Sequence, residues 1–188
     1  MIDIALLTEK RYLRTLSDDW YVRNIIKEDS LVQDELERLN ISCKRVAWDE
    51  NFVPSDFKFA LFRTTWNYFD EINNFMVFLN NCKNSISLIN SHDLILWNLD
   101  KRYLLSLRDQ GVNIPETHIV NKKTKVSLQE IVDQYGWRDI VIKPCVSAAA
   151  WNTHYVKYNN IKTVEFLFSD LTKSHDMMVQ SFQKKNNV

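Results

Sequence analysis

The sequence predicts an α/β protein in two parts, in which a mostly parallel sheet is followed by an α+β unit. In the first half, short apolar runs typical of strands alternate with segments whose apolar residues recur at helical spacing. This alternation is typical of βαβ units, whose strands run parallel. In the second half, two apolar runs are joined through a loop of small residues and flanked by helical patterns. We place the boundary near Trp97, between domains at residues 1–97 and 98–188.

The first domain is expected to hold four strands and two helices. Asp29-Ser30 predicts the N-cap of a helix that ends at Asn40, and apolar residues at helical spacing predict a second helix over 72–79. Residues 8–28 show no pattern that predicts a helix or a strand. The strands are expected at residues 4–7, 41–48, 57–62 and 86–89.

The second domain begins with a helical pattern that runs from Asn98 to Gly111. Ser127 and Glu130 are spaced as a capping box, and Gly136 is a stop signal for the helix between them. A further amphipathic helix is expected over 164–171. Strands are expected at 115–120, up to Lys143, at 154–158 and at 177–182.

Composition excludes several classes of function. Lys plus Arg and Asp plus Glu both number 24, so no net positive field favours nucleic acid or an anionic membrane surface. No segment has the length and apolar character of a membrane span, and the N-terminus reads as a first strand rather than a signal. The three cysteines lack CxxC spacing, which indicates free thiols in a reducing compartment and hence a cytoplasmic protein. With only two glycines, the chain has neither a GxGxxG fingerprint nor a Walker-type phosphate loop.

Lys143 is the most unusual residue of the second domain. It ends a run of Ile and Val, and the following Pro144 keeps it in an extended conformation. An ammonium group at the end of a buried strand is costly unless an anion meets it. The alternative is a lysine whose aliphatic stem lies along the strand while its charge reaches water.

Six segments have the order and spacing of a known family. They are Leu61–Tyr68, Leu88–Asn90, Trp97–Leu104, Gly111–Thr117, Val141–Ala148 and Met178–Phe182. Together they resemble the ATP-grasp superfamily, in particular its branch of prokaryotic glutathione synthetase and the ligase of cycloserine biosynthesis. The resemblance covers roughly residues 1–183 and implies a Rossmann-like pre-ATP-grasp domain, followed by the central nucleotide-binding (lid) subdomain of an ATP-grasp ligase.

The resemblance also implies ATP as the cofactor and assigns residues to it. Lys101 would contact the phosphates, and Lys143 would lie at the adenine and α-phosphate. The hinge strand, whose backbone would pair with the adenine edge, consists of Gln180, Ser181 and Phe182. The flap over the β- and γ-phosphates would consist of Ser147, Ala148, Ala149 and Ala150.

The residue types suit this chemistry, with one departure. Two fixed ammonium groups would offset the desolvation of a triphosphate. Small flap residues would let backbone N–H groups approach phosphate oxygens. Since the flap has alanine where such loops favour glycine, we expect its backbone to reach unusual φ values less freely. Arg63, at the end of a strand, would bind a substrate carboxylate or form a structural ion pair, and both interpretations stay open.

In the family, the magnesium ligands follow the hinge strand in a C-terminal lobe, and this sequence ends at Val188. We therefore expect no metal site in this chain, and magnesium only with that lobe. The first hypothesis is the N-terminal and central part of a carboxylate–amine ligase that forms an acyl phosphate, incomplete as this chain alone. The alternative is a non-catalytic, truncated binding or partner module. The expected partners are a nucleotide and small carboxylate and amine substrates, and a homodimer is left open.

Overall fold

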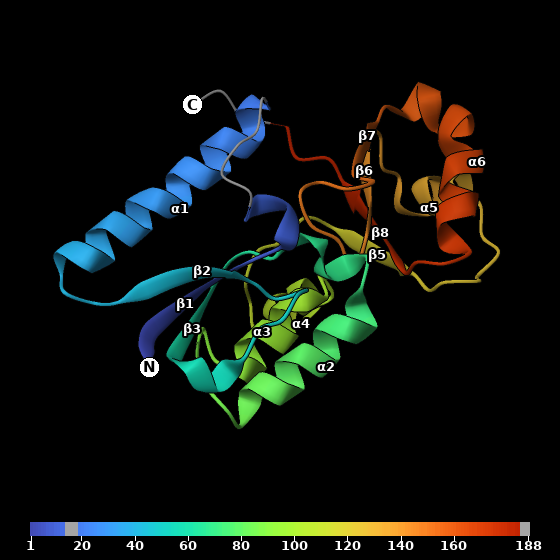
Figure 1. The fold of residues 1–188 in the computed structure, drawn as a ribbon. Coiled ribbons are helices and arrows are strands. Elements are labelled where there is room, and N and C mark those ends of the chain that lie inside the picture. Colours follow the sequence, from blue (N-terminus) through green and yellow to red (C-terminus); the bar gives the residue numbers. More distant parts are fainter. Residues whose placement is uncertain (14–18, 185–188) are drawn as a thin grey trace. The chain divides into compact units, whose positions relative to one another are not determined.

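The computed structural model describes residues 1–13 and 19–184, and the chain divides into two compact units, Met1–Leu96 and Trp97–Val188 (Figure 1). The predicted α/β fold is confirmed: the first unit holds a parallel sheet, and the second unit holds a separate antiparallel sheet that also has four strands. No helix in the described part of the chain is both long enough and apolar enough to cross a membrane.

The first unit is built on a parallel sheet with strand order β2-β1-β3-β4. Its strands are β1 (Ile2–Thr8), β2 (Cys43–Ala47), β3 (Phe57–Thr64) and β4 (Ser87–Ile89). The central strand β1 pairs in parallel with β2 and with β3, so that Leu6 lies between Arg45 and Leu61. Short 3-10 helices follow or precede these strands at Lys10–Tyr12, Pro54–Asp56 and Trp66–Phe69.

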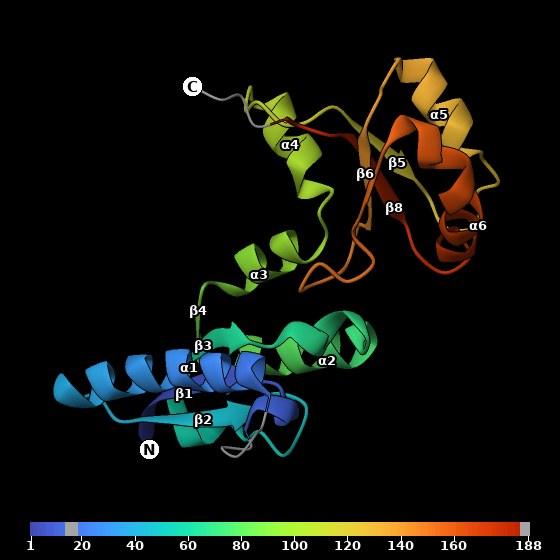
Figure 2. The same ribbon diagram turned by 90° about the horizontal axis from the view of Figure 1, so that it is seen from above.

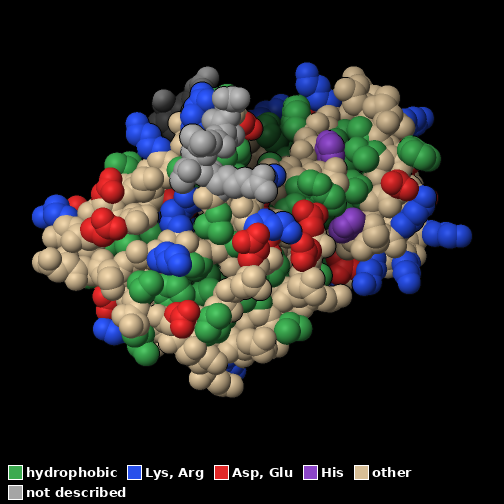
Figure 3. Space-filling model, in the orientation of Figure 1, with side chains coloured by type: hydrophobic (Ala, Val, Ile, Leu, Met, Phe, Trp, Pro, Cys, Tyr) green, Lys and Arg blue, Asp and Glu red, His purple; other side chains and the backbone are tan. Residues whose placement is uncertain are grey.

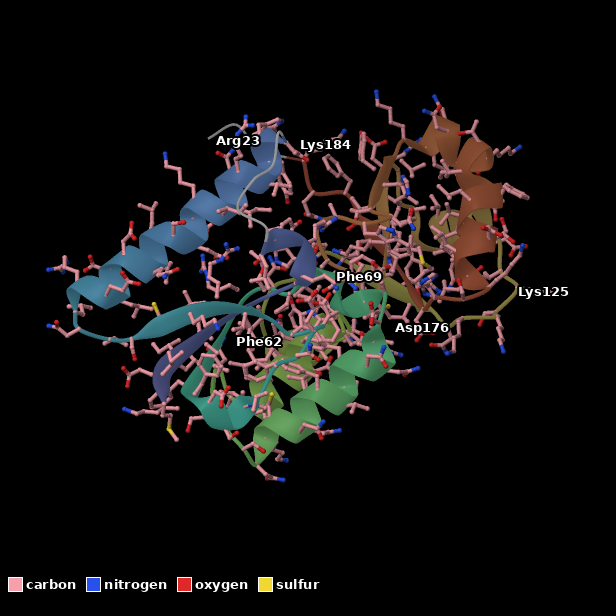
Figure 4. The ribbon with its side chains drawn as sticks, viewed as in Figure 1. Arg23, Phe62, Phe69, Lys125, Asp176 and Lys184 are labelled. Carbon is pink, nitrogen blue, oxygen red and sulfur yellow. The ribbon has the colours of Figure 1, made fainter. Side chains whose placement is uncertain are left out.

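Helices α1 (Trp20–Arg38) and α2 (Ile72–Lys83) cover opposite faces of this sheet (Figure 1). The face towards α2 carries an apolar core that includes Ala5, Leu7 and Cys82. Phe62, labelled in Figure 4, packs between β3 and α2 against Phe75 and Phe78. Ala5, Leu6 and Leu7 of β1 are buried in succession, as expected for a parallel strand that is covered on both faces.

The predicted N-cap at Asp29-Ser30 is wrong, because both residues lie inside α1. The helix begins ten residues earlier, where the Asp19 side chain accepts a hydrogen bond from the Tyr21 N–H at 2.8 Å. Asp29 is instead a buried carboxylate on the helix face towards the sheet, 1% exposed. An acidic side chain at a buried helical position interrupts the apolar pattern on which the prediction depended.

The second unit is built on an antiparallel sheet with strand order β5-β8-β6-β7. Its strands are β5 (Thr117–Val120), β6 (Ile140–Pro144), β7 (His154–Val156) and β8 (Met177–Ser181). Helices α5 (Leu128–Tyr135) and α6 (Ile161–Thr172) lie side by side over one face (Figures 1 and 2). Ile140, Ile142 and Val179 face these helices in the core.

Local signals in the second unit are borne out with small shifts of boundary. The capping box of Ser127 and Glu130 is present, and Gly136 ends α5 with φ of 65°. The helical pattern predicted from Asn98 is divided in the structure: α3 spans His92–Leu99, a turn follows, and α4 begins at Tyr103 and ends at Asp109. Lys101 therefore lies in the turn before α4.

Candidate functional site

Lys143 and Gln180 lie on the face of the second sheet opposite α5 and α6. Successive side chains of a strand point to opposite faces. Since Ile140 and Ile142 face the helices, Val141 and Lys143 face away from them. In the neighbouring strand β8, Gln180 pairs with Val141 and shares this face. The face opposite α5 and α6 thus carries one cationic and one amide side chain.

Lys101 joins this site through the segment that follows β6. Its backbone N–H donates to the Cys145 carbonyl oxygen at 2.8 Å. Its ammonium Nζ donates to the Ser147 carbonyl oxygen at 2.6 Å and to the Ser147 hydroxyl oxygen at 2.8 Å. The structure therefore brings together Lys101 and Ser147, two residues that the sequence separates by 46 positions.

The turn that holds Lys101 is fixed by a charged network. The Arg102 guanidinium donates to Asp100 at 2.6 Å and lies 3.4 Å from a carboxylate oxygen of Asp176. Asp176, labelled in Figure 4, also accepts from the Cys145 N–H through its backbone oxygen at 2.8 Å. These contacts hold the turn against the end of β6 and the start of β8.

The two lysines are half-buried and lack carboxylate partners in the described part of the chain. Burial and, after it, the positive charge of Lys143 lower the pKa of Lys101 to about 8, against the opposing effects of Cys145 and Asp100. Burial also lowers the pKa of Lys143. Both groups would gain from an anion, because an opposite charge compensates for the lost hydration of an ammonium.

The loop after Ser147 contradicts the expectation that alanine would keep its backbone from unusual φ values. Ala149 and Ala150 have φ of 48° and 56°, and Asn152 has φ of 48°. Two turn hydrogen bonds support this conformation, from the Trp151 N–H to Ala148 O at 2.9 Å and from the Thr153 N–H to Ala150 O at 3.0 Å. The alanines reach the left-handed region without glycine, at a cost of about 1–2 kcal/mol for each residue.

Backbone N–H groups of the expected hinge strand are engaged within the second unit. The Ser181 N–H donates to Glu116 O at 3.0 Å, and the Phe182 N–H donates to Asp139 O at 2.8 Å. The Gln180 side chain donates to the Thr117 hydroxyl at 2.8 Å. Pairing of the hinge with an adenine edge stays a prediction, and in this conformation these two N–H groups are already used.

Arg63 lies in the first unit and forms the structural ion pair that the sequence left open. Its guanidinium is 2.8 Å from Glu28 and 3.2 Å from Asp29, both on α1. Arg45 of β2 is also 3.2 Å from the buried Asp29. Arg63 is thus paired with two carboxylates, and its role in substrate binding stays a prediction.

A second polar cluster, which sequence reasoning missed, lies at the carboxyl ends of β1, β2 and β3. Glu9 is 2% exposed and accepts from the Asn67 N–H at 2.7 Å. The Asn67 side chain accepts from the Trp48 indole N–H at 2.7 Å and donates to Asp49 at 2.8 Å. Burial raises the pKa of Glu9, and Arg11 opposes that shift. The sequence offered one sign of this cluster, namely that its residues follow the ends of predicted parallel strands, because ligands of open α/β sheets bind beyond the carboxyl ends of the strands.

Other titratable and basic groups do not join either cluster. No group of three or more His, Cys, Asp or Glu side chains that could hold a metal occurs among residues 1–13 and 19–184. Burial raises the pKa of the Cys145 thiol to about 12, so this thiol is protonated at neutral pH. A recess of about 690 Å³ lies between the loop Lys123–Ser127 and α6. Basic side chains gather on this side of the unit in Figure 3, and none of the residues predicted for the site lines it.

Comparison with known proteins supports the family resemblance. The family model described as D-cycloserine synthetase DcsG, N-terminal domain, matches residues 4–90. The cycloserine biosynthesis protein DcsG of Streptomyces lavendulae is 30% identical over 83 residues, which are 44% of this chain and 28% of that protein.

Solved structures share the fold over nearly the whole chain. The crystal structure of D-cycloserine synthetase DcsG matches 95% of this chain and 59% of its own, with a TM-score of 0.78 and 20% identity. An ATP-grasp RimK domain protein from Sphaerobacter thermophilus matches 98% of this chain and 65% of its own, with a TM-score of 0.66 and 16% identity. The chain therefore spans less than two thirds of the length of these relatives. It has the fold of an ATP-grasp-type ligase, and its first unit resembles the N-terminal domain of D-cycloserine synthetase.

Proposed function

We propose that the second unit binds the phosphates of ATP at Lys101 and Lys143, and that the chain is the N-terminal and central part of a carboxylate–amine ligase. The observation that carries this proposal is the pair of half-buried ammonium groups without carboxylate partners in the described residues. A D-alanine–D-alanine ligase from Bacillus anthracis, crystallised in complex with ATP, supports it through its fold. That structure matches 98% of this chain and 60% of its own, with a TM-score of 0.54 and 15% identity.

The proposed roles follow from the positions of the side chains. Lys143 lies on the face of the sheet opposite α5 and α6, where a flat base and its first phosphate would lie beside β8. Lys101 lies beside the loop that starts at Ser147, so its charge would face the outer phosphates under that loop. In this scheme residues 1–97 form the pre-ATP-grasp domain and residues 98–188 the central nucleotide-binding subdomain.

The complete reaction of such a ligase transfers a phosphoryl group to a carboxylate and then displaces phosphate with an amine. The two lysines would stabilise the negative charge that develops on the transferred group. The described residues do not fit a magnesium site, because no three candidate ligands converge among them. No step is therefore assigned to a metal held by these residues.

The polar cluster at the carboxyl ends of the first sheet is the proposed place for the organic substrate. Glu9, Asp49 and Asn67 present carboxylate and amide groups there, held in place by mutual hydrogen bonds. Such groups suit a substrate that carries an amine. Arg63 would serve a substrate carboxylate only after exchange of its partners on α1.

Thermal unfolding with and without ATP tests the nucleotide site. ATP should raise the melting temperature of the wild-type chain, and Lys143→Ala should abolish the rise. Lys162→Ala is the matched control, since Lys162 is exposed on α6 of the same unit and should keep the full rise. An equal rise in melting temperature in all three proteins would show that Lys143 does not bind the nucleotide.

A non-catalytic binding module is the second candidate. The observation in its favour is that the ammonium of Lys101 is already satisfied by Ser147, and that the hinge N–H groups are used within the unit. Release of ADP in the presence of amino acids would exclude this candidate. A rise in melting temperature with ATP but no ADP release would favour it.

A further inference from the structure

The start of the loop Ser147–Thr153 is held by Lys101 at two points. The Lys101 backbone binds Cys145, and two of the three N–H bonds of its ammonium point to the backbone and side-chain oxygens of Ser147. Ser147 is 5% exposed. One residue thus clamps both ends of the segment from Cys145 to Ser147, and fixes the direction in which the chain enters the loop.

The loop beyond this clamp is strained. Ala149 and Ala150 are consecutive alanines in the left-handed region, where the Cβ atom lies too close to the following carbonyl oxygen. Such conformations persist only where their surroundings enforce them. The described enforcing contacts are the clamp on Ser147, the two turn hydrogen bonds and an edge contact at 5.2 Å between the rings of Trp151 and His175.

The acceptors that Lys101 uses are neutral, and an anion would compete well for its ammonium. The bonds from the ammonium to Ser147 are charged on the donor side alone, whereas an anionic acceptor adds the attraction between opposite charges, which is stronger in a partly buried site than in water. A phosphate placed between Lys101 and Lys143 would draw N–H groups of Lys101 away from Ser147. The entry to the loop would then lose its anchor while the strain at the alanines remained.

We propose that Lys101 is a latch: without ligand its ammonium holds the loop Ser147–Thr153 in the left-handed conformation, and a phosphate-bearing ligand takes over the ammonium and frees the loop. The identity of the ligand rests on the proposed function, whereas the ligand-free latch does not. The same lysine would thereby couple arrival of the anion to rearrangement of the loop beside it.

Amide hydrogen exchange at Trp151 and Thr153 tests the latch, because these two N–H groups form the turn bonds of the loop. In the absence of ligand, Lys101→Met should speed their exchange at least about tenfold. Lys143→Met removes the neighbouring charge but keeps the latch, and should leave both amides near wild type. Ser147→Ala deletes one of the two acceptors and should give a smaller increase, about threefold.

The ligand arm uses ATP and inorganic tripolyphosphate with the full chain. Each should bring the wild-type loop amides towards the rates of Lys101→Met, and should leave that variant unchanged. Slow exchange at the core amide of Val179 shows that a variant is folded. If Lys101→Met does not fold, Ser147→Ala still tests the latch. Wild-type rates in both variants would overturn the latch whether or not ATP binds.

Two further outcomes separate the latch from the proposed function. Calorimetric binding of tripolyphosphate without any change at Trp151 and Thr153 would overturn the release of the loop while supporting the anion site. Absence of binding by either ligand would overturn both the nucleotide site and the ligand-driven half of the latch. Fast exchange in Lys101→Met would then still establish the ligand-free clamp.

Discussion

Raising the pH from 7 to 9 should weaken anion binding mainly through Lys101. Burial and the neighbouring charge of Lys143 together lower the pKa of this side chain to about 8. About nine tenths of the free protein carries the charge at pH 7, about half at pH 8 and about one tenth at pH 9. A bound phosphate favours the charged form, so the pKa of Lys101 rises on binding.

The magnitude follows from this linkage. If the bound state requires the charged form, binding at pH 8 takes up about half a proton, and the apparent Kd rises about tenfold between pH 7 and pH 9. The pKa of Lys143 is also lowered by burial, which can add to the loss at the alkaline end. Binding near neutral pH should involve little proton uptake.

Isothermal titration with tripolyphosphate measures this uptake directly. Titrations at pH 8 in two buffers of different ionisation enthalpy give the number of protons from the slope of the observed enthalpy. Lys162→Ala should behave as wild type, and Lys101→Met should bind weakly and lose the uptake. Tight binding at pH 8 with no uptake, or the same uptake in Lys101→Met, would refute the assignment of the titrating group.

Three other predictions concern stability. Ala150→Gly should stabilise the chain by about 0.5–1 kcal/mol in urea unfolding. The substitution relieves about 1–2 kcal/mol of strain at positive φ, which exceeds the entropic cost of glycine of about 0.4–1 kcal/mol. A loss of stability would argue against the left-handed conformation. Asp29→Asn should lower the free energy of unfolding by an amount near the lower end of about 3–5 kcal/mol, because two arginines lose a buried partner and Arg63 is partly exposed. An unchanged midpoint of urea unfolding would contradict the ion-pair geometry. Folding raises the pKa of Glu9, so the free energy of unfolding should fall as the pH rises from the usual pKa of glutamate through the raised pKa. Glu9→Gln should flatten that fall. An identical pH profile in the variant would count against burial of this carboxyl group.

Much of the fold was accessible from local patterns. Strands of the first unit follow apolar runs, and α5 follows its capping box and Gly136, because these signals act over a few neighbouring residues. The first half of α1 was missed because the helix buries little apolar surface there, Ile25 and Asp29 being its buried residues. The buried position of Asp29 can be recognised only when its partners Arg45 on β2 and Arg63 on β3 are known.

The site was accessible in part. Lys143 stands out in the sequence because a charge ends an apolar strand, and in the structure it lies on the face opposite α5 and α6. Its role in nucleotide binding stays a prediction. The contact between Lys101 and Ser147 depends on a turn and a loop that meet only in the folded unit. The polar cluster of Glu9, Asp49 and Asn67 likewise assembles from the ends of three strands, so no local spacing announces it.

The conformation of the alanine loop could not be predicted from residue type. Alanine disfavours positive φ, and composition alone therefore predicts the opposite of what Ala149 and Ala150 adopt. Tertiary contacts overcome this preference at a cost of about 1–2 kcal/mol for each residue.

The central claim is that phosphates of ATP bind between Lys101 and Lys143. Backbone chemical shifts followed by NMR during titration with ATP test it most directly, because they locate the ligand on the chain. The account predicts the largest shifts at Lys101, Lys143 and Ser147. Chemical-shift changes confined to the recess lined by Lys123 and Lys125 would contradict it. Lys125 is labelled in Figure 4.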